Sequence, residues 1–558
     1  MAFLDLLFRR DKRGDAFVGG TERAAEVEKN RGNEHLAKGE LEEAARCYED
    51  AIRIYPGYAE AHVNLGHVRR EQKAYAESEQ LLLRAIALKP SLWQAHLNLG
   101  RTAEDQRQFD EAAACYRHVI GLRPSYLDTH SWPEAHWRLA TVFAEQERHE
   151  DALRVLDQML TINPEWAEVR CNRGTALNKL GRNEEALAEY QRALSQNPEN
   201  PAIVARFIGI VYEDMGQLDD ALAWVRRARA LDPKGLEGQI EEALMLLLRG
   251  DFENGWPAHE AMLPNLLGRK KGIETDAQYY RRVFTPERYW TGDDLGGGTL
   301  LLWTEQGLGD SLMMLRYLPL IKAHGAGRIV IICEQALVRI FRSFAEVDEI
   351  LVKRDSIDQL RFDRHCSTMS LPFLFRTRLD TIPNRMPYIS VPEGVGAKWR
   401  SRLAGYPGLK IGIAWGGNPT LVKDRERSIP LARFAPLMSV PGITWVSLQK
   451  GEPASQLKAL AWPVVDWMDE CDDMQDTAGL IDALDLVVSV DTSVVHLAGA
   501  LAKPVWLLNR FGSEWRWMLE REDSPWYPSL RIFRQPSRGD WESVLARVAA
   551  ELRNTAAR

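Results

Sequence analysis

Prolines recur at a nearly constant interval through the N-terminal part of the chain. Their successive separations are 34, 34, 40, 34 and 35 residues, and they are Pro56, Pro90, Pro124, Pro164, Pro198 and Pro233. Twelve positions before each proline stands a small residue: Ala44, Ser78, Ala112, Ala152, Ala186 and Ala221. A second small residue stands twenty-four positions before each proline: Gly32, Gly66, Gly100, Ala140, Gly174 and Gly209. Small residues let two helices approach closely, and a proline ends the second helix because it donates no N–H and clashes with the preceding turn. The pattern therefore predicts stacked helix pairs.

This period is that of the tetratricopeptide repeat (TPR), a helix–turn–helix unit. Large residues at the next core position are expected to fill the space between repeats: Tyr48, Leu82, Tyr116, Leu156, Tyr190 and Val225. We predict an array of six repeats over residues 23–235, preceded by a flexible basic tail at 1–22. The longer interval holds extra residues near 127–132, which we expect to form a surface loop, with a partner contact as the alternative.

The period changes after the array. Residues 236–290 are expected to be divergent capping helices and a linker, because a last repeat must cover its apolar face. Beyond them, short apolar runs alternate with helical stretches, which implies parallel sheets covered by helices. The runs are 299–304, 328–333, 409–415, 444–448, 486–490 and 504–508. We predict two such domains, 291–395 and 396–558, with the final helix at 541–553 crossing back over the first of them.

Composition excludes several classes of protein. The net charge of −8 gives no indication of a nucleic-acid-binding chain. No apolar run approaches the roughly 18 residues that a membrane span needs. The basic tail lacks the order of a secretory signal, and a weak membrane-surface helix is the alternative to a frayed end. The six cysteines are scattered without close pairs, which favours reduced thiols and a cytoplasmic location.

An asparagine recurs on the inner helix of most repeats. It stands two positions before the small residue in four of the six repeats, as Asn30, Asn64, Asn98 and Asn172, where the other two have Arg138 and Phe207. An amide both donates and accepts, so it can bond an extended peptide backbone without reading its sequence. In this respect the array resembles the superhelix of O-GlcNAc transferases, whose asparagine ladder holds the acceptor polypeptide. We predict that the four asparagines bind the acceptor; capping or bridging of helices is the alternative.

The first chemical motif is the segment 303–311, between a predicted strand and an amphipathic helix. Gly307 and Gly309 permit a tight turn and close approach of a ligand to backbone N–H groups, and a helix start favours negative charge. The segment is neither a Walker A loop nor a dinucleotide fingerprint. Asp310 is either a cap of that helix or a functional carboxylate.

The second motif, 485–501, again runs from a strand through a polar turn into a helix. Asp491, Thr492 and Ser493 either cap this helix or hold a diphosphate with its first-turn amides. His496 follows Thr492 by four residues on the same face, so it either reaches the same ligand or packs in the core.

The third motif places Trp415 and Asn418 after a strand, and Arg425 and Arg427 ahead of a helix. The two arginines either neutralise a phosphate or form a solvated run of charge.

Together these residues resemble a known family. Residues 290–553 are similar to the bacterial lipopolysaccharide heptosyltransferase type of glycosyltransferase, particularly its TPR-fused branch, in the segments Glu305–Asp310, Arg427–Pro430, Ser447–Lys450, Asp491–His496 and Asp523–Pro528. The resemblance implies a GT-B fold: two Rossmann-like domains that follow the TPR α-solenoid, with 291–395 on the acceptor side and 396–558 on the nucleotide-sugar side.

The resemblance also implies roles for the motif residues. Asp310 matches the catalytic base and Arg427 a residue that contacts the donor phosphates. The other donor-binding residues are Gly307, Gly309, Trp415, Asn418, Arg425, Gln449, Lys450, Asp491, Thr492, Ser493 and His496, with Gln449 and Lys450 beside the nucleotide base. The family often has glycine where this chain has Ser493, which leaves the donor's identity open.

The expected reaction moves a sugar from a nucleotide-sugar donor to Ser/Thr hydroxyls of a protein acceptor in the TPR groove. By family analogy the acceptor is flagellin and the transfer inverts the anomeric centre. No metal or cofactor is expected, because no DxD-type motif stands in a suitable loop. Two alternatives remain: a glycolipid or polysaccharide glycosyltransferase whose TPRs recruit assembly partners, and a TPR interaction protein without catalysis.

Overall fold

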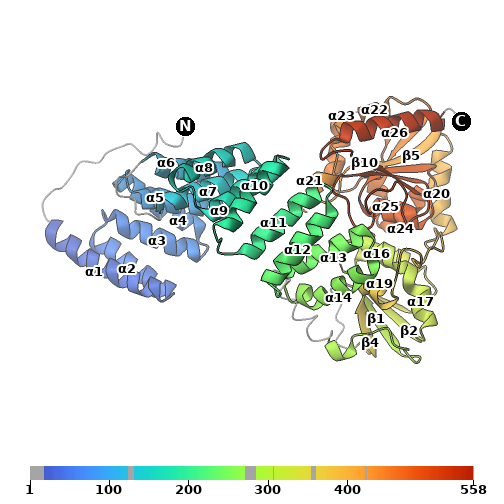
Figure 1. Ribbon diagram of the computed structural model, residues 1–558, viewed down its shortest axis with the longest axis horizontal. Helices are drawn as coiled ribbons and strands as arrows, with labels where there is room; N and C mark the ends of the chain where they lie inside the picture. Colours follow the sequence, from blue (N-terminus) through green and yellow to red (C-terminus); the bar gives the residue numbers. More distant parts are fainter. Residues whose placement is uncertain are drawn as a thin grey trace. The chain divides into compact units, whose positions relative to one another are not determined.

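The computed structural model describes residues 18–122, 131–269, 285–305, 307–353, 360–420, 424–460 and 462–556 (Figure 1). The chain divides into two compact units, residues 1–211 and 212–558. The first helix begins at Val18, inside the expected tail at 1–22, whose residues 1–17 lie outside the described residues. The expected loop near 127–132 lies partly outside them too, and a helix already begins at Ser131.

The first unit is an α-solenoid of TPR helix pairs. Its helices are α1 (Val18–Ala37), α2 (Leu41–Ile54), α3 (Ala59–Glu71), α4 (Tyr75–Leu88), α5 (Trp93–Asp105), α6 (Phe109–Gly121), α7 (Ser131–Glu145), α8 (His149–Ile162), α9 (Ala167–Lys179), α10 (Asn183–Ser195) and the greater part of α11 (Pro201–Asp214). The even-numbered helices α2, α4, α8 and α10 each end shortly before one of the recurring prolines. The predicted use of proline as a helix stop is therefore confirmed in these repeats.

Close approach within each pair explains the periodic glycines. A Cβ added to Gly32 would lie 2.6 Å from the ring of Tyr48, and one added to Gly100 would lie 2.6 Å from the ring of Tyr116. Both tyrosines are fully buried. The small and large positions of the sequence pattern therefore face one another, and the repeat core depends on having no side chain at the glycines.

The second unit begins with helices that share a core with the sheet region. They are α12 (Leu218–Leu231), α13 (Leu236–Arg249) and α14 (Phe252–Arg269). Leu248, Phe252 and Trp256 belong to the same hydrophobic cluster as the residues of both sheets. The ring of Trp256 lies 5.2 Å from that of Trp515, edge to face. The segment expected only to cap the array thus also packs on the domains that follow it.

The first sheet has four parallel strands in the order β3-β2-β1-β4. The strands are β1 (Thr299–Trp303), β2 (Arg328–Cys333), β3 (Glu349–Val352) and β4 (Arg364–Ser367). The helical segments around it are η2 (Pro286–Arg288), α16 (Leu308–Met314), η3 (Leu315–Tyr317), α17 (Leu318–Ala323), η4 (Gln335–Leu337), α18 (Val338–Phe341), η5 (Thr368–Ser370) and α19 (Leu371–Leu374). Along β1, Leu300 and Leu302 join one buried cluster and Leu301 and Trp303 another, so both faces of the strand are covered.

The second sheet has six parallel strands in the order β10-β9-β8-β5-β6-β7. They are β5 (Leu409–Ala414), β6 (Ile443–Ser447), β7 (Val464–Val465), β8 (Leu486–Val490), β9 (Val505–Asn509) and β10 (Leu530–Arg534). The helical segments are α20 (Glu393–Leu403), α21 (Asp424–Arg427), η6 (Leu431–Phe434), α22 (Ala435–Met438), η7 (Glu452–Ala454), α23 (Ser455–Leu460), η8 (Met468–Glu470), α24 (Met474–Asp482), α25 (Ser493–Ala500) and α26 (Trp541–Ala556). The structure thus follows the predicted TPR solenoid with parallel sheets and helices.

The last helix differs from the prediction. Trp541, Val544 and Leu545 of α26 are buried in the same cluster as Ile413 of β5 and Val488 of β8. The expectation that this helix crosses back over the first domain is therefore wrong, since α26 covers the second sheet itself (Figure 1). Its apolar stripe predicts an amphipathic helix but not which sheet the stripe covers.

Candidate functional site

Asp310 lies in the first turn of α16, just after β1. The N–H of Gly307 donates to Asp310 Oδ2 at 3.1 Å, so the carboxylate caps its own helix. The other oxygen, Oδ1, accepts a hydrogen bond from Arg516 Nη2 and forms an ion pair with it. Asp310 therefore caps α16 and at the same time faces a cation from the second sheet's side.

Arg516 lies in the loop between β9 and β10, and the sequence reasoning missed it. Its guanidinium stacks on the ring of Trp515, 4.4 Å from the ring centroid. Burial by itself would lower the pKa of Arg516, but the carboxylates of Asp310, Glu514 and Asp491 raise it above its ordinary value. Arg516 is thus positively charged, and the carboxylates near it come from loops of both sheets.

Asp491 and Thr492 connect β8 to α25. Asp491 is buried, and burial together with the like charge of Glu514 raises the pKa of its carboxyl, against the lowering effect of Arg516. Thr492 is the N-cap residue, and its hydroxyl lies 3.3 Å from Ser489 Oγ. Thr492 makes no side-chain capping hydrogen bond to α25. The first turn of α25, at Ser493, is therefore suited to an anion.

The helices α16 and α25 touch through Gly309 and His496. A Cβ added to Gly309 would lie 2.5 Å from His496 Cδ2, so no other residue fits there without movement. His496 Nδ1 lies 3.0 Å from the hydroxyl of Tyr527, and the ring packs 5.3 Å from that of Trp517. Burial and then the nearby arginines hold the pKa of His496 well below its usual range, so the ring is neutral. His496 is a packed core residue that also borders the Asp310–Arg516 pair.

A second buried arginine holds the same loop. Arg316 Nη1 donates to the carbonyl of Trp526 at 2.8 Å, and its guanidinium lies over the ring of Tyr527, 4.9 Å from the centroid. Arg316 follows α16 in the first sheet's domain, whereas both partners lie in the same loop as Arg516. The two arginines thus fix the loop against both sheets' domains.

The helix α14 also contributes to this neighbourhood. His259 is buried, and burial followed by the charge of Arg516 lowers its pKa to about 4, against the opposing effect of Asp310. Its Nδ1 and the Nε1 of Trp256 are buried without a hydrogen-bond partner in the part of the chain that the structure describes. Buried polar atoms normally have partners, so these two are exceptions close to Asp310. Neither residue stands in a recognisable sequence motif.

The third motif flanks the point where the second sheet reverses its strand order, between β5 and β8. Arg427 Nε donates to the buried Asp424 at 2.9 Å, and the charge of Arg427 acts on both Asp491 and His496. Arg427 therefore lies where the sequence places it, close to the second motif. Trp415 is buried, whereas Asn418 and Arg425 are exposed.

The side chain of Gln449 is occupied by backbone groups. Its Oε1 accepts from the N–H groups of Trp415 and Gly416 at 2.9 and 2.8 Å, and its Nε2 donates to the carbonyls of Gly416 and Lys450 at 2.9 Å each. Lys450 Nζ donates to the carbonyl of Cys471. These contacts hold the loops after β5 and β6 together; that the two residues meet a nucleotide base stays a prediction.

The asparagines of the solenoid differ from one another. Asn64 Nδ2 donates to Asn33 Oδ1 at 2.9 Å, and Asn98 Nδ2 donates to the carbonyl of Gln94 at 3.0 Å. Asn30 is exposed and Asn172 is half-buried. Asn64 thus bridges two helices, as the alternative reading of the sequence has it, whereas Asn98 bonds within its own helix α5. Acceptor binding by the set stays a prediction.

In the described ranges no three or more His, Cys, Asp and Glu side chains are grouped so that they could hold a metal ion. Of the helices in those same ranges, none is both long enough and apolar enough to cross a membrane.

Comparison with known proteins identifies the repeats. Family models described as Tetratricopeptide repeat match residues 29–92 and 97–165, 139–206, and 177–240. TPR repeats indicate protein–peptide interaction. Among solved structures, the fold is similar to YrrB, a TPR protein with an unusual peptide-binding site (19% identity, 36% of this chain and 100% of that chain, TM-score 0.30), and to a tetratricopeptide repeat protein from Parabacteroides merdae (16% identity, 46% and 97%, TM-score 0.37).

Two curated relatives are similar over different lengths. The chain is 30% identical over 105 residues to U-box domain-containing protein 70 of Oryza sativa subsp. japonica, which covers 19% of this chain and 13% of that protein. It is 28% identical over 446 residues to Protein FlbA of Caulobacter vibrioides, which covers 75% of this chain and 72% of FlbA. Since 446 residues exceed the TPR-matched region, the chain contains TPR repeats, and its similarity to FlbA extends beyond them into the sheets.

Proposed function

We propose that this chain is a GT-B glycosyltransferase that moves a sugar from a nucleotide-sugar donor to Ser/Thr hydroxyls of a protein acceptor. One observation carries the proposal: Arg516 forms an ion pair with Asp310, after β1 of the first sheet, and its charge also acts on Asp491, after β8 of the second. Open parallel sheets bind ligands outside the carboxyl ends of their strands. The two motifs therefore lie where the ends of both sheets can act on one substrate.

The donor is assigned to the second sheet. The motifs after β5 and β8 flank the reversal of strand order, where such sheets hold nucleotides. The start of α25 at Ser493 and the guanidinium of Arg427 supply positive charge for a diphosphate. These groups would stabilise the phosphate that departs when the sugar is transferred.

Proton transfer is assigned to Asp310. The acceptor hydroxyl must lose its proton as its oxygen attacks the anomeric carbon, and a carboxylate within hydrogen-bond reach accepts it. Arg516 pairs with Asp310 and holds its carboxylate in position. His259 borders the pair and, being neutral near pH 7, adds no further positive charge there.

The TPR array supplies the protein acceptor. Its repeats indicate a protein or peptide partner, and the resemblance to TPR-fused flagellin glycosyltransferases names flagellin as the first acceptor to test. Asn30 and Asn172 make no hydrogen bond within the described repeats that would occupy their amides, and so are the first asparagines to test for acceptor binding.

The test is turnover by the purified full-length chain. Non-glycosylated flagellin is incubated with UDP-, GDP-, ADP- or CMP-linked sugars, and release of the nucleotide is measured. At least one donor should give acceptor-dependent release, and Asp310→Asn should slow it by roughly 10²–10⁴-fold.

A matched control is available in Asp473. It caps α24 through the N–H of Gln475 at 2.8 Å and pairs with Arg339 at 3.1 Å, as Asp310 caps α16 and pairs with Arg516. Its side chain is 15% exposed, against 14% for Asp310. Asp473→Asn should keep wild-type turnover. Equal turnover by folded Asp310→Asn, or no donor turned over at all, would contradict the proposal.

A further inference from the structure

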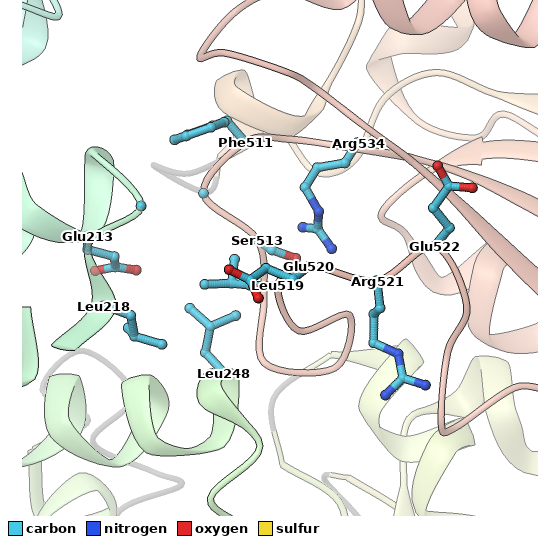
Figure 2. Close-up of a pocket in the computed structure, with 12 residues that line it drawn as sticks. Glu213, Leu218, Leu248, Phe511, Ser513, Leu519, Glu520, Arg521, Glu522 and Arg534 are labelled. Carbon is cyan, nitrogen blue, oxygen red and sulfur yellow. The ribbon is translucent and has the colours of Figure 1, made fainter.

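A cavity of about 420 Å³ lies apart from the candidate site residues (Figure 2). It opens between the turn after α11, the end of α13 and the loop that joins β9 to β10. Leu218, Leu248, Phe511 and Leu519 give it an apolar wall. A volume of this size lies within the range of sites that hold small organic molecules.

Arg534, at the end of β10, lines the same cavity. Its Nη2 donates to the carbonyl of Trp517 at 3.2 Å, whereas its Nη1 is buried and has no hydrogen-bond partner among the described residues. No ion pair involving Arg534 is present in those ranges either. Burial lowers the pKa of Arg534 to about 10, and no neighbouring carboxylate counters this effect. A buried guanidinium with an empty donor is costly unless an anion or water meets it.

The other charged side chains of the lining are engaged or exposed. Arg521 pairs with Asp523 at 2.7 Å, and Glu522 lies 3.7 Å from Arg531. Figure 2 shows Arg521 and Glu522 pointing away from the guanidinium of Arg534, which extends toward Ser513 and Leu519. The interior of the cavity is therefore apolar on one side and cationic at Arg534, and Glu213 and Glu520 add two carboxylates elsewhere in the lining.

We propose that this cavity binds a small organic anion, with its carboxylate or phosphate on the guanidinium of Arg534 and its apolar part against Leu218, Leu248 and Phe511. The ligand must carry both an acid group and an apolar part, because the apolar wall and the single cation are each too little to hold a small molecule alone. It is separate from the Asp310–Arg516 pair, and its existence does not depend on the proposed glycosyl transfer.

The test is binding to the full-length chain by isothermal titration calorimetry, with no sugar donor present. Phenyl phosphate and benzoate are the probes, and phenol is the neutral control. At least one of phenyl phosphate and benzoate should bind, and phenol should not. The anion that binds more tightly shows whether the site prefers a phosphate or a carboxylate. Arg534→Met should weaken that binding by roughly 10- to 100-fold, the effect of one lost charged hydrogen bond, while Arg521→Met should leave it unchanged.

A second variant covers the case in which Arg534→Met does not fold. Gly512 lines the cavity, and a Cβ added there would meet no atom within 4 Å. Gly512→Trp should therefore fold, fill the cavity and abolish binding of the anion. The proposal is overturned if neither anion binds the wild type, if Gly512→Trp binds as tightly as the wild type, or if folded Arg534→Met does so.

Discussion

Arg516 forms an ion pair with Asp310, although the two residues are 206 positions apart and belong to the loops of different sheets. Asp310 opens α16 after β1, and Arg516 lies between β9 and β10. Their side chains are 14% and 11% exposed, so the pair is largely removed from water. The ion pair thus fixes the candidate base, Asp310, against the loop that joins β9 to β10.

Breaking this pair should destabilise the second unit. Arg516→Met leaves Asp310 without its counter-charge in a mostly buried place, which typically costs about 3–5 kcal/mol in the free energy of unfolding. Urea denaturation, followed by tryptophan fluorescence, measures the change. The double variant Asp310→Leu/Arg516→Met should lose less than the sum of the two single variants.

The control for this measurement is Arg339→Met. Arg339 also pairs with an aspartate that caps a helix, but its side chain is 43% exposed. Exposed pairs contribute about 0–1 kcal/mol, so this variant should unfold almost like the wild type. If Arg516→Met cost no more than Arg339→Met, the pair would have no special structural role.

The contact between α16 and α25 should not tolerate a methyl group. Gly309→Ala places a Cβ 2.5 Å from His496 Cδ2, and overpacking of this kind costs about 1–3 kcal/mol. Gly307→Ala places its Cβ 3.5 Å from Asp310 Oδ2, an ordinary contact, and should be tolerated. Thermal unfolding of the two variants checks the difference. Equal midpoints for both would show that the two helices separate easily.

Stability should fall on mild acidification because of His259. Its pKa is about 4 in the folded chain and about 6.5 in an unfolded one, so the unfolded chain binds more protons between these values. The free energy of unfolding should therefore decrease as the pH drops from about 6.5 toward 4, by up to about 3 kcal/mol from this group.

The measurement is urea denaturation at a series of pH values from 7.5 to about 4.5. His259→Phe should show a shallower loss of stability over this range than the wild type. His324→Phe, at an exposed position, should keep the wild-type slope. If the free energy of unfolding of His259→Phe fell with pH as steeply as that of the wild type, His259 would not be the cause of the acid sensitivity.

Gln449 should matter for folding of the second sheet. Gln449→Leu removes an amide that serves four backbone groups, and each buried group left without a partner costs about 1–3 kcal/mol. Gln456 is a matched control, since its Oε1 accepts one hydrogen bond, from Leu431 N–H at 2.8 Å. Gln449→Leu should lower the denaturation midpoint clearly more than Gln456→Leu. The reverse order would contradict the structural role of Gln449.

Local patterns made much of the fold predictable from the sequence. The repeat of proline and glycine predicts the helix pairs, because each repeat is stabilised mainly by its neighbours. The apolar runs at 328–333 and 486–490 predict β2 and β8 with their observed bounds. β4 (Arg364–Ser367) and β10 (Leu530–Arg534) were missed, because polar side chains interrupt their apolar pattern.

The candidate site was only partly predictable. Asp310 and Asp491 follow apolar strands and open helices, which are local signals. Arg516 and His259 carry no such signal, since their importance comes from contacts between segments far apart in the chain. Sequence reasoning also could not show that the amide of Gln449 is used by backbone groups of the neighbouring loop.

The central claim is that this chain transfers a sugar to a protein through Asp310, and intact-mass spectrometry of secreted flagellin tests it most directly. Flagellin from three strains is compared: the wild type, a strain without this chain and a strain that carries Asp310→Asn. We expect the wild-type flagellin to be heavier by a whole number of sugar residues, and the other two to have the mass of the bare polypeptide. Identical flagellin masses in all three strains would contradict the account.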